Sequence, residues 1–233
     1  MAKKEIALIV GAGRGLSASL TRLFASENME VAIAARNVDK LSSLCQETGA
    51  KSYTCDATQI SQVDDLFSSV TSDIGEPDIV VYNASNRARG PVQELDPEAV
   101  RQAIEISCFG GFLVAQASAK QMIPRGRGTI LLTGASASVK GYPNSSSFAM
   151  GKFGLRGLAQ ALARELQPKN IHVAHFVIDG GILQGPDDSR ASARGEDAML
   201  RPEEIAKDYL HVHRQHRSSW TWEIELRPWV EKF

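Results

Sequence analysis

The stretch IALIVGAGRGLS, residues 6–17, decides the fold of this chain. Its first five residues are apolar and predict a buried strand, and the turn that follows, with Gly11, Gly13 and Gly15, opens a helix. A turn of this kind directs backbone N–H groups and a helix N-terminus at a phosphate, so the stretch predicts a dinucleotide-binding βαβ unit. Leu16 stands where the common GxGxxG pattern has its third glycine, and a purely structural turn is the alternative.

Outward from this turn, short apolar runs alternate with longer helical patterns, which is typical of a parallel sheet built from βαβ units. Seven runs predict strands at residues 6–10, 31–35, 51–55, 79–82, 129–133, 172–178 and 222–226. We find no repeat and no linker, so we expect one domain over residues 1–233. The expected fold is α/β and Rossmann-type: a doubly wound, seven-stranded parallel sheet flanked by helices in a three-layer sandwich.

Two long helices are marked by their ends. Asp96-Pro97-Glu98 supplies an N-cap residue, a proline at the first helical position and an acid in the first turn. Pro124 and the turn at residues 125–128 are expected to end this helix. The second helix is expected from about residue 145 to 167, where Pro168 stops it.

Three glycines, Gly151, Gly154 and Gly157, recur at three-residue spacing along the second helix. Glycine weakens a helix by about 1 kcal/mol relative to alanine. We therefore expect another backbone to approach the helix closely at these positions.

The composition is that of an ordinary globular protein. Of 233 residues, 43% are hydrophobic and 23% charged, and 26 Lys and Arg against 27 Asp and Glu leave a formal net charge of -1. This balance gives no electrostatic reason to expect nucleic acid or an anionic membrane as partner, and no apolar run approaches the ~20 residues of a membrane span. The N-terminus has no hydrophobic signal region, which favours a cytoplasmic protein.

Neither the cysteines nor the histidines form a metal-binding pattern. The three cysteines are odd in number and lack ligand spacing, so we expect them to be reduced. His172 and His175 lie in an apolar strand and are expected to be core residues rather than ligands. No metal site is predicted.

An arginine stands where NAD-binding proteins of this fold have an acidic residue. In an NAD site, an Asp or Glu about 20 residues after the glycine turn binds the adenosine ribose. This chain has Arg36 at that place, and Arg14 lies in the glycine turn. A guanidinium suits a phosphate, so the pair favours NADP(H) over NAD(H). Two solvated surface arginines are the alternative.

Further stretches occur in the order and spacing of a known family. Residues 10–17 are similar to its TGxxxGxG turn, Asp56 to its adenine-contacting Asp, residues 82–85 to its NNAG stretch, and residues 179–182 to its Pro-Gly segment beside the nicotinamide. On these residues the chain resembles the short-chain dehydrogenase/reductase family over essentially its whole length. The resemblance, with the arginines above, places these residues at the cofactor: Gly11, Gly13, Arg14, Gly15, Leu16, Arg36, Asp56, Ala57, Asn83, Ala84, Lys152, Gly180 and Ile182.

The resemblance also implies an activity. The family moves a hydride between a nicotinamide and a carbonyl or alcohol carbon, while a tyrosine passes the proton and a lysine four residues later lowers its pKa and holds the ribose. Here Lys152 is kept, but Phe148 replaces the tyrosine. The family's serine aligns with Ala135, one residue before Ser136, and its helix asparagine with Ser107. In this the chain resembles a subgroup of the family that has Phe for Tyr.

Phenylalanine has no ionisable proton, and the loss of positioned acid–base help typically costs 10²- to 10⁴-fold in rate. Ser136 and Tyr142 are the first candidates for a replacement donor, and Ser147 is also conceivable. As alternatives, Ser136 is a loop hydroxyl bonded to backbone and Tyr142 a pocket-wall aromatic. Lys152 either anchors a nicotinamide ribose or is an ordinary lysine on a solvated helix face.

The C-terminal part is expected to serve the substrate and self-association. Residues 182–202 are small and polar and predict a mobile lid, or else a surface loop without a gating role. Trp222, Ile224 and Leu226 are expected on one face of the last strand. The resemblance implies a homodimer or homotetramer; tryptophans buried within a monomer are the alternative.

The leading interpretation is an NADP(H)-binding oxidoreductase with an unconventional proton donor and a small-molecule substrate that the sequence does not identify. The alternative is a catalytically silent dinucleotide-binding protein that works as a sensor or oligomer partner. A scaffold of the same fold without any nucleotide is the third interpretation.

Overall fold

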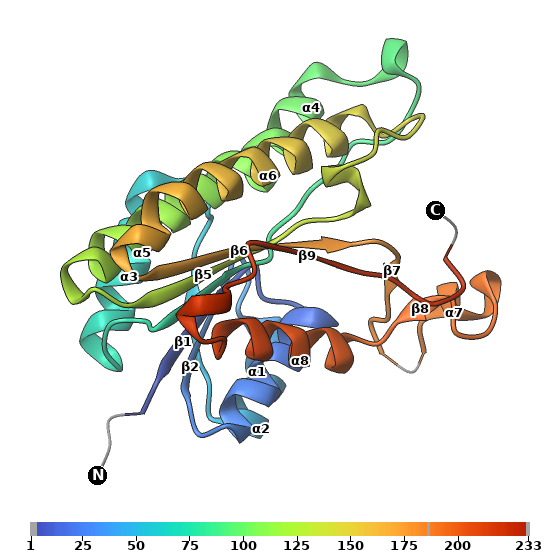
Figure 1. The fold of residues 1–233 in the computed structure, drawn as a ribbon. Coiled ribbons are helices and arrows are strands. Elements are labelled where there is room, and N and C mark those ends of the chain that lie inside the picture. Colours follow the sequence, from blue (N-terminus) through green and yellow to red (C-terminus); the bar gives the residue numbers. More distant parts are fainter. Residues whose placement is uncertain (1–3, 186, 232–233) are drawn as a thin grey trace.

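Seven parallel strands form one sheet in the structure, a computed structural model that describes residues 4–185 and 187–231 (Figure 1). In order across the sheet they are β3 (Lys51–Thr54), β2 (Glu30–Ala35), β1 (Ile6–Val10), β4 (Ile79–Tyr82), β5 (Gly128–Thr133), β6 (Ile171–Ile178) and β9 (Glu223–Leu226). All seven predicted strands are confirmed to within one residue at each end. The strand order reverses between β1 and β4, and open α/β sheets bind ligands at such a switch point.

Helices cover both faces of the sheet (Figure 1). On one face lie α1 (Leu16–Ser26), α2 (Ser42–Thr48) and α8 (Pro202–His213). On the other lie α3 (Ile60–Asp73), α5 (Gly110–Arg125) and α6 (Ser146–Leu166), with α4 (Pro97–Ile104) packed on α6. The predicted three-layer, doubly wound fold is therefore confirmed.

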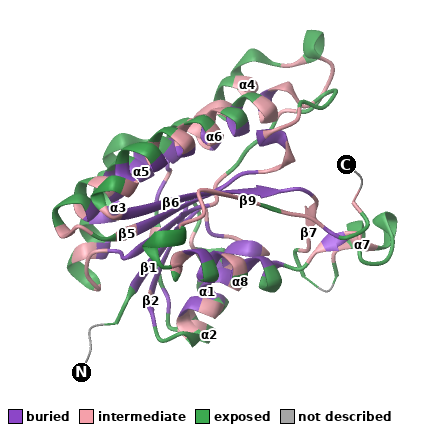
Figure 2. Cartoon of the chain, in the orientation of Figure 1, coloured by how far each residue is buried: buried purple, intermediate pink, exposed green. Residues whose placement is uncertain are grey.

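The two layers of helices explain why the strands are continuous apolar runs. Along β1, Leu8 and Val10 belong to the core beneath α3, α5 and α6, whereas Ala7 and Ile9 belong to the core beneath α1, α2 and α8. Figure 2 shows buried strands between helices whose outer faces are exposed. Strands buried on both sides are apolar at most positions.

Between α4 and α5 the chain makes a π-helical turn, Glu105–Phe109, that the sequence analysis did not predict. α4 begins as predicted at Asp96, whose carboxylate accepts hydrogen bonds from the next turn. Tyr82 donates a hydrogen bond to the Ile106 carbonyl inside the π turn. Such turns are frequent at functional sites.

α5 ends at the turn of residues 125–128, as predicted. Pro124 lies inside the last turn, and the helix ends at Arg125 because Gly126 adopts the left-handed conformation with φ of 61°.

Close packing along α6 is confirmed at two of the three glycines, although the nearest atoms belong to side chains rather than to the expected backbone. A Cβ on Gly151 would lie 2.7 Å from Ser107 Cβ, and a Cβ on Gly154 would lie 2.7 Å from Cys108 Sγ, so the π turn packs directly on α6. The expectation is wrong for Gly157, which is exposed and where a Cβ would meet nothing within 4 Å. The close contact is therefore confined to the half of α6 that lies nearer the π turn.

The C-terminal segments differ in part from expectation. Trp222 precedes β9 and packs with the core beneath α6, whereas Ile224 and Leu226 pack with the opposite core, so the predicted common face is wrong. A bend before the strand turns Trp222 to the other side. The expected lid contains α7 (Ser189–Arg194) between two short paired strands, β7 (Gly181–Ile182) and β8 (Met199–Leu200). Pro186 lies outside the described residues, and a lid function stays a prediction.

Two other expectations are settled by burial and by the cysteine geometry. His172 and His175 are buried in β6, as predicted, and Cys45, Cys55 and Cys108 are free. Among the described residues, no helix combines the length and the apolar character needed to cross a bilayer.

Candidate functional site

The glycine-rich turn lies directly against the backbone that follows β4. Gly11 has φ of +89°, and a Cβ there would lie 2.4 Å from the backbone nitrogen of Ala84, so the position accepts only glycine. Asn83 Nδ2 donates a 2.7 Å hydrogen bond to Ser17 Oγ, which donates in turn to the Gly11 carbonyl at 3.1 Å. The end of β4, the turn and the start of α1 are thus joined. No local sequence pattern predicts this bridge through Ser17.

A cavity of about 220 Å³ opens beside this turn at the carboxyl ends of β1, β2 and β4. Its lining includes six residues predicted at a cofactor: Gly11, Arg36, Asp56, Ala57, Asn83 and Ala84. It also includes Lys40, from the 3-10 turn Asp39–Leu41, which the sequence analysis missed. Arg36 and Lys40 therefore line one cavity. The sequence signal that could have identified Lys40 is a second basic residue four positions after Arg36.

The other residues predicted at the cofactor lie outside the lining of this cavity: Gly13, Arg14, Gly15, Leu16, Lys152, Gly180 and Ile182. Arg14 is exposed, and Leu16 is buried in the core. A Cβ on Gly15 would lie 3.1 Å from the Leu183 carbonyl oxygen. The second half of the turn therefore contacts the segment after β7 rather than Arg36.

Lys152 is a buried lysine at the carboxyl end of β5. It is 2% exposed, and its Nζ donates a 2.7 Å hydrogen bond to the Thr133 carbonyl. Burial, together with the nearby Arg87 guanidinium, lowers the pKa of Lys152 to about 7. The alternative of an ordinary lysine on a solvated helix face is therefore wrong.

Phe148, one turn earlier on α6, lies under an arginine that the sequence analysis missed. Arg87 Cζ is 4.6 Å from the centroid of the Phe148 ring, and Lys152 Nζ is 5.9 Å from the same centroid. Both distances are in the range of cation–π attraction. No local pattern marks Arg87, because its aromatic partner comes from a distant helix.

Two buried serines hold the backbone on either side of Arg87. Ser107 Oγ accepts from the Asn86 N–H and donates to the Asn86 carbonyl, both at 3.2 Å. Ser147 Oγ accepts from the Ala88 N–H at 3.0 Å and donates to the Ala88 carbonyl at 2.8 Å. Both hydroxyl protons are engaged with backbone carbonyls, so these serines position the segment.

The two candidate replacement donors are less enclosed. Ser136 is half-buried in the 3-10 turn Ser136–Ser138, and Tyr142 is 44% exposed. Within the part of the chain that the structure describes, neither side-chain hydroxyl has a hydrogen-bond partner. Ser136 therefore lacks the backbone bond that its alternative interpretation assigned to it.

His175 is the centre of a buried hydrogen-bonded chain close to Lys152. Arg156 makes two hydrogen bonds to Glu223, at 2.6 and 2.8 Å, and Glu223 Oε2 lies 3.1 Å from His175 Nδ1. Ser138 Oγ lies 3.3 Å from His175 Nε2. Because a carboxylate only accepts, Nδ1 carries the proton and Nε2 accepts from Ser138. Burial outweighs the attraction of Glu223 and lowers the pKa of His175 to about 4.

Comparison with known proteins settles the family. A family model described as short chain dehydrogenase matches residues 5–184, well over half of the chain. The chain belongs to the short-chain dehydrogenase family. Short-chain dehydrogenases are oxidoreductases, and the chain has the NAD(P)-binding Rossmann fold of that family.

Individual short-chain dehydrogenases are similar over most of the chain. Short chain aldehyde dehydrogenase 1 of Euphorbia lathyris is 31% identical over 180 residues, which cover 72% of this chain but 61% of that relative. Carbonyl reductase family member 4 of Xenopus tropicalis is 25% identical over 89% of this chain and 90% of its own. The crystal structure of a short-chain dehydrogenase from Rhodopseudomonas palustris is 31% identical with a TM-score of 0.84, covering 97% of this chain and 99% of that one.

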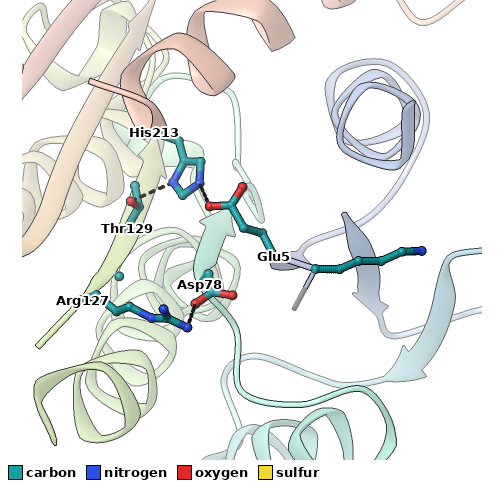
Figure 3. A pocket seen from close by; sticks show the side chains of 7 residues that line it. Glu5, Asp78, Arg127, Thr129 and His213 are labelled. Carbon is teal, nitrogen blue, oxygen red and sulfur yellow. Dashed lines mark hydrogen bonds and ion pairs between the residues drawn. The ribbon is translucent and has the colours of Figure 1, made fainter. Parts of the chain in front are cut away.

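A second pocket of this short-chain dehydrogenase lies at the opposite, amino ends of β1, β4 and β5 (Figure 3). His213 Nδ1 is 2.9 Å from Thr129 Oγ1, its Nε2 is 3.2 Å from Glu5, and Arg127 pairs with Asp78 at 3.2 Å. These charges already pair with one another, so the pocket carries no argument for a site. Within residues 4–185 and 187–231, no three His, Cys, Asp or Glu side chains are grouped to hold a metal ion.

Proposed function

We propose that this short-chain dehydrogenase binds NADP(H) in preference to NAD(H) and acts as an oxidoreductase whose proton donor is not a tyrosine at the usual position. The observation that carries the cofactor preference is that Arg36 and Lys40 line one cavity beside Gly11. A phosphate on the adenosine ribose is the feature that NADP has and NAD lacks, and two cations favour it. Asp56, also in the lining, accepts two hydrogen bonds from Thr58, which engage one of its oxygens.

The buried lysine fits a nicotinamide dinucleotide equally well. The Lys152 ammonium has three N–H donors, and the described contacts use one of them, to the Thr133 carbonyl. The remaining donors are suited to ribose hydroxyls. When bound, the nicotinamide ring supplies or accepts the hydride.

Phe148 cannot donate a proton to a substrate. Its ring has no hydroxyl, and Ser107 and Ser147 donate their protons to backbone carbonyls. Ser136 and Tyr142 remain the proposed donors, since their hydroxyls are unbonded within the described residues. Without a positioned acid, ordinary ketone reduction is expected to be slower by about 10²- to 10⁴-fold than with one.

The same engaged hydroxyls support a second candidate function. A silent nucleotide-binding protein needs the cavity and Lys152 but no proton donor, and here Phe148, Ser107 and Ser147 all lack a free hydroxyl. Oxidation of NADPH by carbonyl or activated-alkene substrates separates the two functions. Binding of NADPH without any turnover favours the silent protein.

The cofactor preference predicts that Arg36→Ala and Lys40→Ala each weaken NADPH binding by about 10- to 100-fold, because each removes a charge-assisted contact to the phosphate. The dissociation constant for NADH should stay within about twofold. Isothermal titration calorimetry of both nucleotides measures the two constants. Thermal unfolding gives a second readout, because ligand at 100 times its dissociation constant adds about 2.7 kcal/mol of stability.

Arg164→Ala is the matched control, since Arg164 is an exposed arginine on α6, outside the cavity lining. It should leave the NADPH constant unchanged. A lower dissociation constant for NADH than for NADPH in the unaltered protein would overturn the preference, and failure to bind either nucleotide would overturn the function itself.

We also propose that the protein self-associates through α5 and α6. Phe112, Met150 and Phe153 on these helices are 40%, 55% and 45% exposed. Full burial of such a side chain contributes about 1.5–3 kcal/mol. The double variant Met150→Glu, Phe153→Glu should therefore weaken association by at least about 10-fold in sedimentation equilibrium. Ile60→Glu on α3, at a position that is 61% exposed, should leave it unchanged, and equal effects would argue against this surface.

A further inference from the structure

We propose that the substrate of this site carries a carboxylate, and that the guanidinium of Arg87, held on the ring of Phe148, binds it. This inference rests on the proposed oxidoreductase function and names the chemical class of its substrate. Arg87 lies near Phe148 and Lys152, and no described carboxylate pairs with it.

The position of Arg87 is determined by the fold on three sides. Its guanidinium lies on the ring of Phe148, with Cζ 4.6 Å from the centroid. Its two neighbours in sequence, Asn86 and Ala88, are each bound through both backbone polar groups to a buried serine. A further backbone bond runs from the Gly90 N–H to the Asn144 carbonyl at 3.2 Å. Together, the ring contact and these hydrogen bonds hold the segment and the Arg87 guanidinium in one position.

That place is the Lys152 end of the site. Lys152 Nζ is 5.9 Å from the same Phe148 ring, so two cations share one aromatic side chain. Arg87 is not part of the lining of the cavity that contains Arg36 and Lys40. An anion at Arg87 is therefore separate from the adenosine phosphate that we assign to that cavity.

The charge of Arg87 is not balanced within the described protein. No carboxylate of residues 4–185 and 187–231 forms an ion pair with it. Arg87 is exposed, and its pKa is lowered by partial desolvation and by the like charges of Arg89 and Arg190; Arg190 is itself paired with Asp188. A bound anion would relieve this repulsion.

The planar fork of a guanidinium matches a carboxylate, which accepts two parallel N–H···O bonds. Within the described residues, no hydrogen bond engages the N–H groups of the Arg87 guanidinium, so they are available for such a pair. Phe148 lacks the hydroxyl of a tyrosine, and its ring instead supports the guanidinium of an arginine that binds an anion. The geometry points to an oxo acid or a hydroxy acid as substrate.

The test measures equilibrium binding to the full chain saturated with NADPH. The probes are pyruvate, 2-oxobutyrate and benzoylformate, each compared with its uncharged methyl ester by calorimetry. At least one acid should bind about 10-fold or more tightly than its ester. Arg87→Met should weaken that acid by about 10- to 100-fold and leave its ester within about twofold, and Arg87→Lys, which keeps the charge but loses the fork, should be intermediate.

Arg164→Met is the matched control, because Arg164 is an exposed arginine on the same helix as Phe148. Its acid affinity should equal that of the unaltered protein. Modification by phenylglyoxal, mapped by mass spectrometry, adds a readout without any variant: the acid, but not the ester, should protect Arg87. The inference is overturned if no acid outcompetes its ester, or if Arg87→Met and Arg164→Met bind the acid equally. If NADPH itself does not bind, the proposed function fails instead.

Discussion

Gly11→Ala should be among the most damaging single substitutions in this protein, with an expected loss of about 4 kcal/mol in the free energy of unfolding. The new Cβ would lie 2.4 and 2.6 Å from the backbone nitrogen and Cα of Ala84, and 2.8 Å from the carbonyl carbon of Asn83. These are backbone atoms that cannot rotate away. The residue would also hold φ near +89°, which side chains disfavour.

The loss should reach the cofactor as well as stability. Separating the turn from the segment after β4 breaks the path from Asn83 through Ser17 to the Gly11 carbonyl and opens the cavity wall. We expect NADPH binding to fall below detection in calorimetry. Urea unfolding measures the stability change, and the melting temperature should fall by roughly 8–16 °C.

Gly13→Ala is the control within the same turn. A Cβ on Gly13 meets nothing within 4 Å, and Gly13 is not in the left-handed region. Its stability should change by no more than about 0.5 kcal/mol. Equal stability of the two variants would show that Gly11 does not pack on the segment after β4.

Between about pH 6.5 and pH 4, the protein should lose about 3 kcal/mol of stability through His175 alone. The pKa of His175 is about 4 in the folded protein, against 6.5 for the ordinary side chain. In this window the unfolded chain binds a proton that the folded protein does not, so stability is fully present above pH 6.5 and falls as the pH approaches 4. Burial is the main cause, and it outweighs Glu223, while Lys152 and Arg156 act in the same direction as burial.

Urea unfolding at half-unit steps from pH 8 to pH 4 measures this loss. His175→Gln keeps a donor and an acceptor but does not titrate, so its stability should decline by about 3 kcal/mol less than that of the unaltered protein over the same range. His172 is also buried with a lowered pKa and contributes in both proteins, so the difference isolates His175. The exposed His211→Gln serves as control. Parallel pH curves for His175→Gln and the unaltered protein would contradict the assignment.

The strands were predictable because burial between two layers of helices requires runs of mainly apolar residues, which can be recognised in the sequence. Helices on both faces favour apolar residues along β1 and β4, and those runs are visible without coordinates. The prediction from alternating apolar residues fails at Trp222. Alternation placed it on the face of Ile224, but a bend just before β9 reverses it.

The candidate site was predictable only where it is local. The glycine turn carries its own signature, and Arg36 follows it at a characteristic distance, so six of the residues around the Arg36 cavity were found, whereas Lys40 was among those missed. Arg87 was missed because its neighbourhood is assembled from the segment after β4 and from α6. The Ala88 to Ser147 bonds that hold it join residues 59 positions apart.

By itself, the sequence determined the order of strands and helices, the glycine turn, and the presence of Phe148 four residues before Lys152. These follow from side-chain periodicity, backbone freedom and residue chemistry, which act over a few neighbouring positions. Only the tertiary structure decided that Lys152 is buried and that Arg87 lies on Phe148. Burial and pairing depend on which distant segments the sheet brings together, and the pKa and charge balance of a site follow from that assembly.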